Sequence, residues 1–158
     1  MSDFDAFVAR LDYPLYVVTA LAGEERSGCL VGFATQCSID PPRFMVWISK
    51  ANHTFGVALR AATLAVHLVS PDSGLPELFG GRTGDEIDKF ARVDWSAGPG
   101  GVPVLAGASA WFAGHVEGRM DGGDHVGFLL APLAGEVRSD EHPIQLSEAS
   151  DIEPGHPA

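Results

Sequence analysis

The stretch that decides the fold is GCLVGFATQCSIDPPRFMVWISKANHT, which runs from Gly28 to Thr54. Two runs in it are rich in β-branched, aromatic and other apolar residues, Gly28 to Ile39 and Arg43 to Ser49, and each predicts a strand. Asp40-Pro41-Pro42 separates the two runs, because proline has no backbone N–H to donate to a strand ladder. The stretch therefore predicts two successive strands joined by a proline turn.

Working outward, similar apolar runs predict four more strands. The last two of them flank Asp121-Gly122-Gly123-Asp124, a composition typical of a tight hairpin turn. The four predicted strands are Leu15 to Leu21, Thr63 to Val69, Ala108 to Arg119 and His125 to Val137.

Two stretches have a helical pattern. Asn52 to Ala62 carries apolar residues on one side, and Asn52 or Thr54 is suited to cap its start. A weaker stretch covers Ser73 to Phe90, where Gly80-Gly81 predicts an interruption. Six or seven strands with one or two short inserted helices favour a mainly β fold, a closed or nearly closed barrel.

The chain has 158 residues, enough for one domain. We expect this domain over residues 1–145, followed by a frayed acidic tail over residues 146–158, where the apolar pattern is poor. The formal net charge of −11 argues against binding to nucleic acid and to an anionic membrane surface. The first residues are acidic and do not resemble a signal peptide. The two cysteines, Cys29 and Cys37, are expected to be free thiols, which fits a cytoplasmic protein.

Lysine occurs only at positions 50 and 89, so these residues stand out in an acidic chain. Lys50 lies where a strand gives way to a helix, a place where amides, hydroxyls and an ammonium group can hold an anion. The alternative is that Ser49 and Asn52 cap the helix and Lys50 is solvated. Lys89 has a similar alternative, as a solvated helix partner of Asp85.

The predicted hairpin raises the question of a metal site. If the turn is centred between Gly122 and Gly123, His115 faces Leu130 and His125 faces Met120. The two histidines are then too far apart to share one ion, so no metal site is predicted. His125 itself is either a proton donor or substrate contact, or an ordinary strand-end histidine.

Several blocks together resemble one known family. The stretch Gly28 to Thr54 resembles the signature of the flavin reductase-like proteins with the FMN-binding split barrel. DKFARVDW, from Asp88 to Trp95, resembles the Lys-Phe segment of that family, and GGDHVGFLLAPLAGEV, from Gly122 to Val137, resembles its Gly-Asp-His strand. The blocks occur in the order of the family, so the resemblance implies a Greek-key-like split β-barrel and a homodimer.

The resemblance also implies a site. The isoalloxazine and ribityl chain would lie along the strand from position 31 to 36, the FMN phosphate would lie after Ser49, and the Lys-Phe pair would close over the ribityl-phosphate end. His125 would lie near the flavin, where nicotinamide docks, and is the one catalytic residue implied. The cofactor-binding residues implied are Val31, Gly32, Phe33, Ala34, Thr35, Gln36, Ser49, Lys50, Asn52, His53, Thr54, Lys89 and Phe90.

One block departs from the family pattern. Where the family has Thr-x-Ser-Ser, this chain has Leu30 to Phe33, so backbone groups are expected to replace the hydroxyls there.

The implied function is an NAD(P)H-dependent flavin reductase that passes hydride to FMN, with FAD as an alternative flavin. Such an enzyme can supply reduced flavin to a partner monooxygenase. Two alternatives remain at this point: a split-barrel flavoprotein that acts on a small molecule with tightly bound flavin or deazaflavin, and a non-enzymatic flavin-binding electron carrier.

Overall fold

Seven strands form one antiparallel sheet in the computed structural model, which describes residues 2–81, 88–150 and 152. The elements follow the order α1 (Asp3–Val8), β1 (Tyr16–Ala22), β2 (Glu25–Val31), β3 (Ala34–Ser38), β4 (Arg43–Ser49), α2 (His53–Arg60), β5 (Thr63–Leu68), α3 (Leu75–Gly80), β6 (Trp95–Ala97), β7 (Pro103–Leu105), β8 (Ala110–Asp121) and β9 (His125–Val137). Short 3-10 turns cover Pro71–Ser73, Lys89–Arg92, Pro99–Gly101 and Leu146–Glu148.

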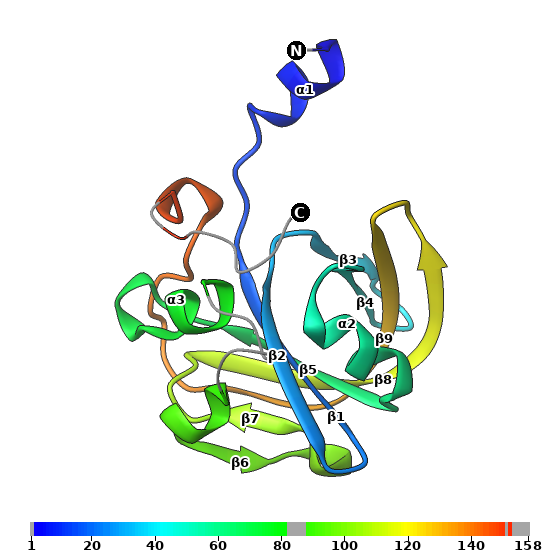
Figure 1. The fold of residues 1–158 in the computed structure, drawn as a ribbon, viewed down its shortest axis with the longest axis vertical. Helices are drawn as coiled ribbons and strands as arrows, with labels where there is room; N and C mark the ends of the chain where they lie inside the picture. Colours follow the sequence, from blue (N-terminus) through cyan, green and yellow to red (C-terminus); the bar gives the residue numbers. More distant parts are fainter. Residues whose placement is uncertain (1, 82–87, 151, 153–158) are drawn as a thin grey trace.

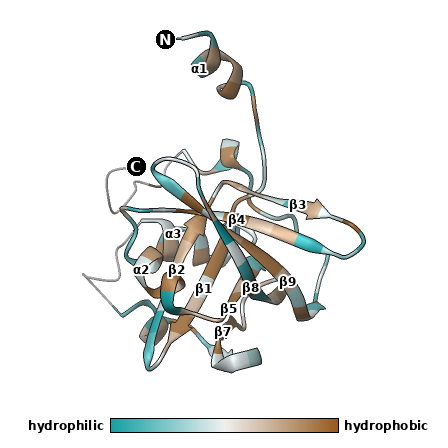
Figure 2. Ribbon diagram, turned by 90° about the vertical axis from the view of Figure 1, so that its right-hand side faces the viewer, coloured by the Kyte–Doolittle hydropathy of each residue, from teal (hydrophilic) through white to brown (hydrophobic). Residues whose placement is uncertain are grey.

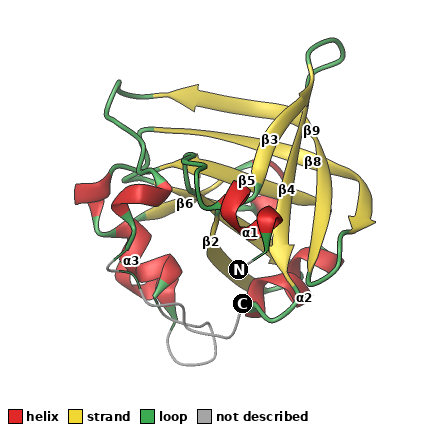
Figure 3. Cartoon of the chain, turned by 90° about the horizontal axis from the view of Figure 1, so that it is seen from above, coloured by secondary structure: helices red, strands yellow, loops and turns green. Residues whose placement is uncertain are grey.

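The large sheet has the strand order β2-β1-β5-β8-β9-β4-β3, and β6 and β7 form a separate ribbon. The strands curve around a common interior, but β2 and β3 at the two ends of the order are not hydrogen-bonded to each other (Figure 1). The barrel is therefore split, as the resemblance to the family implied. Seen from above, α2 and α3 lie on either side of β2, and both helices contact that strand (Figure 3).

The core lies inside the curved sheet, because apolar side chains of the strands face this interior. Its members are fully buried and come from strands distant in sequence, among them Val18, Val46, Leu64, Phe128 and Leu130. Figure 2 shows the hydrophobic stretches along the strands and hydrophilic residues at turns such as the β1–β2 connection. Burial of such side chains, each worth about 1.5–3 kcal/mol, is the main force that closes the sheet around α2.

Gly28 to Ile39 was predicted as one strand, and this prediction is wrong. The chain pairs with β1 up to Val31, opposite Tyr16, and then with β4 from Ala34, opposite Val46. Gly32 and Phe33 lie between the two pairings and belong to neither strand. No proline or turn dipeptide separates the two halves of the run, so its sequence does not predict that they pair with different neighbours.

The hairpin register also differs from the prediction. Asp121 pairs with Val126, and the Gly122 amide donates to the His125 carbonyl at 2.9 Å, so the turn is centred between Gly123 and Asp124. Gly123 has a φ of 125°, a conformation that favours glycine. A bulge between Val116 and Gly118 offsets one residue of this two-residue shift, so His115 lies opposite Ala131 instead of the predicted Leu130.

The helix predicted over Asn52 to Ala62 is confirmed as α2, and Asn52 is its cap, since its side chain accepts the Thr54 amide proton at 2.9 Å. The helix predicted over Ser73 to Phe90 is realised in its first part as α3. Residues 82–87 of that stretch lie outside the described residues, and a 3-10 turn begins at Lys89.

The two ends of the chain are arranged differently. Figure 1 shows α1 set apart from the barrel, and Phe4 and Phe7 on it are 71% and 63% exposed. The region predicted as a tail begins with a 3-10 turn at Leu146–Glu148, and the Ser147 hydroxyl donates to an Asp12 carboxylate oxygen at 2.8 Å. Among the described residues, no helix has the length and apolar character needed to cross a membrane.

Candidate functional site

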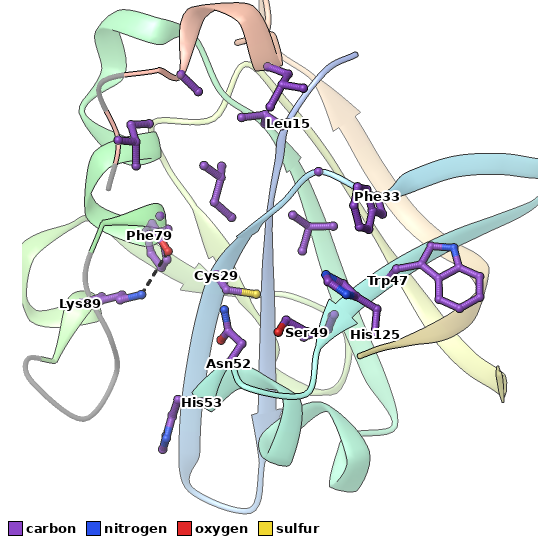
Figure 4. A pocket seen from close by; sticks show the side chains of 18 residues that line it. Leu15, Cys29, Phe33, Trp47, Ser49, Asn52, His53, Phe79, Lys89 and His125 are labelled. Carbon is purple, nitrogen blue, oxygen red and sulfur yellow. Dashed lines mark hydrogen bonds between the residues drawn. The ribbon is translucent and has the colours of Figure 1, made fainter. Parts of the chain in front are cut away.

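A cavity of about 450 Å³ opens between β2, the end of β4, the start of α2, α3 and the C-terminal segment (Figure 4). β2 contributes its last residues, Cys29 to Val31, and Gly32 and Phe33 continue the wall beyond the strand. The cavity has a polar end, an aromatic mouth and an apolar end, which are described in turn.

The polar end is built at the β4–α2 junction. The Ser49 hydroxyl accepts the Ala51 amide proton at 3.2 Å, and Asn52 caps α2, so the turn presents polar groups to the cavity. The first helical residue, His53, also lines the cavity, and its Nε2 lies 3.1 Å from Glu25. Because Arg60 also bonds Glu25, at 2.6 Å, the pKa of that carboxyl group is lowered and the carboxylate stays charged. A helix start combined with polar side chains is a favourable place for an anion.

Lys89 closes the polar end from the opposite side. Its side chain is 5% exposed, and its ammonium donates to the carbonyls of Gly28 at 3.3 Å and Phe79 at 3.2 Å. The Phe79 ring lies beneath the ammonium, 5.5 Å from Nζ, and a Cβ on Gly28 would come within 2.7 Å of that ring. Only glycine at position 28 therefore allows the strand, the ring and the lysine to pack this closely.

Cys29 projects from β2 next to Asn52 and forms part of the cavity wall (Figure 4). Burial raises the pKa of the thiol to about 11, an effect that a hydrogen bond with Thr54 and the nearby charge of Lys89 only partly offset. The thiol is therefore protonated near neutral pH and acts as a small wall residue instead of a nucleophile. The Thr54 hydroxyl is itself buried and lies 2.7 Å from the Ser27 hydroxyl.

The aromatic mouth consists of Phe33, Trp47 and His125. The rings of Phe33 and His125 are 4.9 Å apart between centroids and tilted by 48°. His125 is the first residue of β9, pairs with Ser49, and holds its Nδ1 2.7 Å from Asp124 Oδ1. This contact lowers the pKa of the Asp124 carboxyl group. Trp47 pairs with Gly127, whose missing side chain leaves room for the indole.

The apolar end is formed by aliphatic side chains from both ends of the chain. Leu15 and Leu30 come from the N-terminal half, and a short C-terminal stretch contributes Leu146, Ala149 and Ile152. The Leu15 amide donates to the Ile144 carbonyl at 2.9 Å, which holds this stretch beside β1. Sequence analysis missed these C-terminal residues, because their apolar pattern is weak.

Eight of the residues implied by the resemblance line the cavity together: Val31, Gly32, Phe33, Ser49, Asn52, His53, Lys89 and His125. The other six do not line it: Ala34, Thr35, Gln36, Lys50, Thr54 and Phe90. Ala34 to Gln36 lie on β3, where the Thr35 and Gln36 side chains bond to nearby carbonyls of the same segment.

The remaining three residues have other contacts. The Lys50 ammonium donates to both carboxylate oxygens of Asp121, at 3.1 and 3.2 Å, and so lies against the β8–β9 hairpin. The Thr54 side chain forms a hydrogen bond with the Cys29 thiol and lies 2.7 Å from the Ser27 hydroxyl. The Phe90 ring is buried between Phe79 and Trp95, with centroid distances of 5.7 and 6.1 Å.

Comparison with known proteins places these features in context. The chain is 30% identical to the reductase subunit of stachydrine N-demethylase from Rhizobium meliloti, over 69% of this chain and 48% of that protein, so it spans about half of that relative. It is 29% identical to the FMN reductase (NADH) RutF of Yersinia enterocolitica, over 88% of this chain and 76% of the relative.

This chain is also similar to a protein of known structure. The FMN-binding protein of Thermus thermophilus, crystallised with 1-cyclohex-2-enone, superposes with a TM-score of 0.77 at 28% identity, covering 84% of this chain and 74% of that one. Residues 8–148 match the family described as flavin reductase like domain. Since that match extends over most of the sequence, this chain belongs to the flavin reductase like domain family.

Proposed function

We propose that this protein is an NAD(P)H-dependent flavin reductase that transfers a hydride from reduced nicotinamide to FMN, with FAD as an alternative flavin. The observation that carries the proposal is the polarity of the cavity, which has a buried ammonium at one end and aliphatic and aromatic walls at the other. A flavin mononucleotide has the same division, with a phosphate dianion at one end of a planar, largely apolar ring system. Relatives named as an FMN reductase and as a reductase subunit support this assignment.

The phosphate is assigned to the polar end. Lys89 supplies a positive charge, and the amides at the start of α2 together with the Ser49 hydroxyl supply hydrogen bonds. Lys89 is already buried and held by two carbonyls, so little side-chain entropy is lost when an anion binds. In an acidic chain with a net charge of −11, a local cation of this kind is needed to hold a dianion.

The ring system is assigned to the wall formed by Val31, Gly32 and the backbone of Phe33. Gly32 and Phe33 belong to neither β2 nor β3, and the Phe33 carbonyl accepts the Trp47 amide proton at 2.8 Å. No hydroxyl side chain stands at these positions, so recognition there relies on backbone groups and on apolar contact. Bound flavin supplies the redox chemistry, while the chain binds it, orients it and excludes water from it.

A combined binding and turnover experiment tests this function. The purified protein is titrated with FMN, and oxidation of NADH and NADPH is followed with and without added flavin. A flavin reductase binds FMN and consumes reduced nicotinamide in proportion to added flavin. Binding of FMN with only slow oxidation of either nicotinamide would favour the electron carrier, and absence of FMN binding would contradict the proposal.

A second candidate is reduction of a small cyclic carbonyl compound by tightly bound flavin. It is favoured by the apolar end of the cavity and by the Thermus thermophilus relative, which was crystallised with 1-cyclohex-2-enone. The same titration separates the two candidates. Protein that retains flavin through purification, and that oxidises reduced nicotinamide faster when cyclohexenone is added, would favour the second.

We further propose a cytoplasmic homodimer that delivers reduced flavin to a partner monooxygenase. The free cysteines Cys29 and Cys37 are compatible with a reducing compartment. β9 pairs with β4 only up to Leu130, and beyond it Leu133 and Val137 are 56% and 81% exposed, which suits an interface with a second copy. Two of the relatives are named as reductase subunits of an N-demethylase and of a flavin-dependent monooxygenase, which supports a separate oxygenase as partner.

A further inference from the structure

Phe33 is an apolar side chain in an unusual place. It lies at the mouth of the cavity between two strands, and 52% of it is exposed. Its backbone is fixed, since its carbonyl accepts the Trp47 amide proton, whereas its ring contacts with other aromatic rings of the described residues are edge-on to Tyr13 at 6.5 Å and tilted to His125 at 4.9 Å. A large apolar ring that is left half-exposed beside a cavity points to contact with a ligand.

The His125 ring is held much more firmly than the Phe33 ring. The histidine begins β9 in register with Ser49, its Nδ1 contacts Asp124 at 2.7 Å, and its side chain is 23% exposed. Figure 4 shows Phe33 and His125 next to each other on the same side of the cavity. Phe33, by contrast, lies outside β2 and β3, and its ring makes no polar contact within the described part of the chain.

The spacing of the two rings decides what must happen when a planar ligand binds against them. A planar ring needs about 3.5 Å to each neighbour, so two side chains that sandwich one must stand about 7 Å apart. The centroids of Phe33 and His125 are 4.9 Å apart, so no ring fits between them as they stand. Since His125 is anchored, a planar ligand that stacks on the face of Phe33 turned toward His125 requires the Phe33 ring to move away from His125.

We propose that Phe33 determines the affinity for the nicotinamide substrate, by exchanging its tilted contact with His125 for stacking on the nicotinamide ring. The inference rests on the proposed function, because it assumes that a reduced nicotinamide enters this mouth. Phe33 then acts as a specificity-determining side chain: it covers the mouth in the free protein and provides an aromatic face in the complex. Its effect falls on binding of the nicotinamide and leaves the transfer step and the flavin phosphate contacts alone.

Two substitutions at position 33 separate an aromatic role from a merely apolar one. Phe33→Leu keeps an apolar side chain but removes the aromatic face, and Phe33→Tyr keeps the face. Ile39→Ala is the matched control, because Ile39 is 84% exposed and does not line the cavity. The measurements are KM and kcat for NADH and NADPH, the Kd of FMN, and the Kd of oxidised NAD for the FMN-loaded protein by calorimetry.

For Phe33→Leu we expect KM and the Kd of NAD to rise about five- to tenfold, because one aromatic stacking contact is lost. The values of kcat and the Kd of FMN should stay within about twofold, and Phe33→Tyr and Ile39→Ala should behave like the unaltered protein. Unchanged KM and NAD affinity in Phe33→Leu would overturn the inference. So would a loss of FMN affinity and melting temperature parallel to the change in KM, which would assign Phe33 a structural role.

The same experiment separates this inference from the function on which it rests. If the unaltered protein does not oxidise either nicotinamide in the presence of FMN, the proposed function is wrong and the inference is wrong with it. If the unaltered protein is active and Phe33→Leu keeps its KM and its NAD affinity, only the inference about Phe33 is wrong.

Discussion

The Lys50 ammonium forms an ion pair with Asp121, with 3.1 and 3.2 Å to the two carboxylate oxygens. This contact joins the end of β4 to the β8–β9 hairpin, and the Lys50 amide donates to the Asp124 carbonyl at 2.9 Å in the same place. The hairpin that carries His125 is thereby held against the rim of the cavity. Of the two lysines in the chain, Lys50 therefore holds the β8–β9 hairpin at the cavity rim, whereas Lys89 lies in the cavity wall.

The first prediction compares these two lysines. Lys89→Met should weaken FMN binding about ten- to a hundredfold but riboflavin binding much less, because a charge-assisted contact worth roughly 1.5–3 kcal/mol acts on the phosphate alone. Lys50→Met is the matched control and should change FMN affinity less than about threefold. Fluorescence titration with both flavins gives the values, and an equal loss for FMN and riboflavin in Lys89→Met would contradict the phosphate assignment.

Lys89→Met also removes a buried donor from two carbonyls, so its effect on folding needs a separate measurement. Lys89→Arg keeps the positive charge and serves this purpose. If Lys89→Arg retains the preference for FMN over riboflavin while its melting temperature falls like that of Lys89→Met, the two effects are separated. Loss of that preference in both variants would show that the geometry of the ammonium, and not charge alone, is required.

The second prediction concerns the two thiols. Because burial raises the pKa of Cys29 to about 11, its thiolate fraction at pH 8 is about a hundredfold below that of an ordinary cysteine. Iodoacetamide should therefore modify the exposed Cys37 in the folded protein and leave Cys29 unmodified, whereas both should react after denaturation. In the folded Cys37→Ser variant, Cys29 is the one remaining thiol, and mass spectrometry measures its labelling directly. If Cys29 in this variant were labelled as fast as Cys37 in the unaltered protein, the prediction would be wrong.

Local sequence was sufficient for elements whose signals are local. β4 and β9 have the bounds that their apolar runs predicted, and Asn52 caps α2 as its place before the helix indicated. The predictions that were wrong depend on distant partners. β2 ends at Val31 because the next residues leave β1 for β4, and no proline or turn dipeptide marks this exchange of neighbours in the sequence.

The site shows the same division between local and distant causes. Ser49 at the strand end lies at the polar end of the cavity, but the burial of Lys89 could not be predicted from its sequence neighbours. It depends on carbonyls from β2 and α3, which lie 61 and 10 residues away. The local pattern also allowed a solvated lysine paired with Asp85, whereas Lys89 is 5% exposed, and Asp85 lies outside the described residues.

The third prediction concerns stability and pH. His67 is fully buried: its Nε2 accepts the Leu105 amide proton at 3.0 Å, so its Nδ1 carries the proton that is donated to the Val17 carbonyl at 2.9 Å. Burial lowers the pKa of His67 from 6.5 to about 4. Between these values the unfolded chain binds a proton that the folded chain does not, so the free energy of unfolding falls as the pH is lowered through this range.

The size of this pH-dependent loss of unfolding free energy follows from the pKa values of His67 in the unfolded and folded chain. Between pH 7.5 and pH 5 the contribution of His67 to this loss is about 2 kcal/mol, at about 1.4 kcal/mol for each pKa unit. Urea unfolding at the two pH values measures it. His67→Gln cannot titrate and should show a loss that is smaller by that amount, whereas an equal pH dependence in both proteins would show that other groups are responsible.

The fourth prediction concerns the oligomeric state. Light scattering should give about twice the chain mass of 16.6 kDa. Val137→Asp places a charge on the exposed part of β9 and should lower the measured mass toward that of one chain, while Ile39→Asp, an equally exposed position on the β3–β4 connection, should not. A monomeric mass for the unaltered protein at all concentrations would contradict the homodimer.

The last prediction concerns His125. The histidine is held at the mouth by Asp124 and by its pairing with Ser49, and it lies beside the place assigned to the nicotinamide. Hydride transfer needs no acid, so an imidazole there can only hydrogen-bond the nicotinamide amide or stabilise charge that develops on the reduced flavin. His125→Ala should therefore lower kcat/KM for reduced nicotinamide about tenfold, or about 1.4 kcal/mol of transition-state binding, and leave the Kd of FMN nearly unchanged.

A purely structural histidine would give a different pattern. His125→Ala would then lower the melting temperature, while the rate per folded molecule would stay the same. His115→Ala is the matched control, because His115 is an exposed histidine on β8 that does not line the cavity. Steady-state kinetics and thermal melts on both variants separate the two roles, and a kcat/KM for His125→Ala equal to that of His115→Ala would remove His125 from the site.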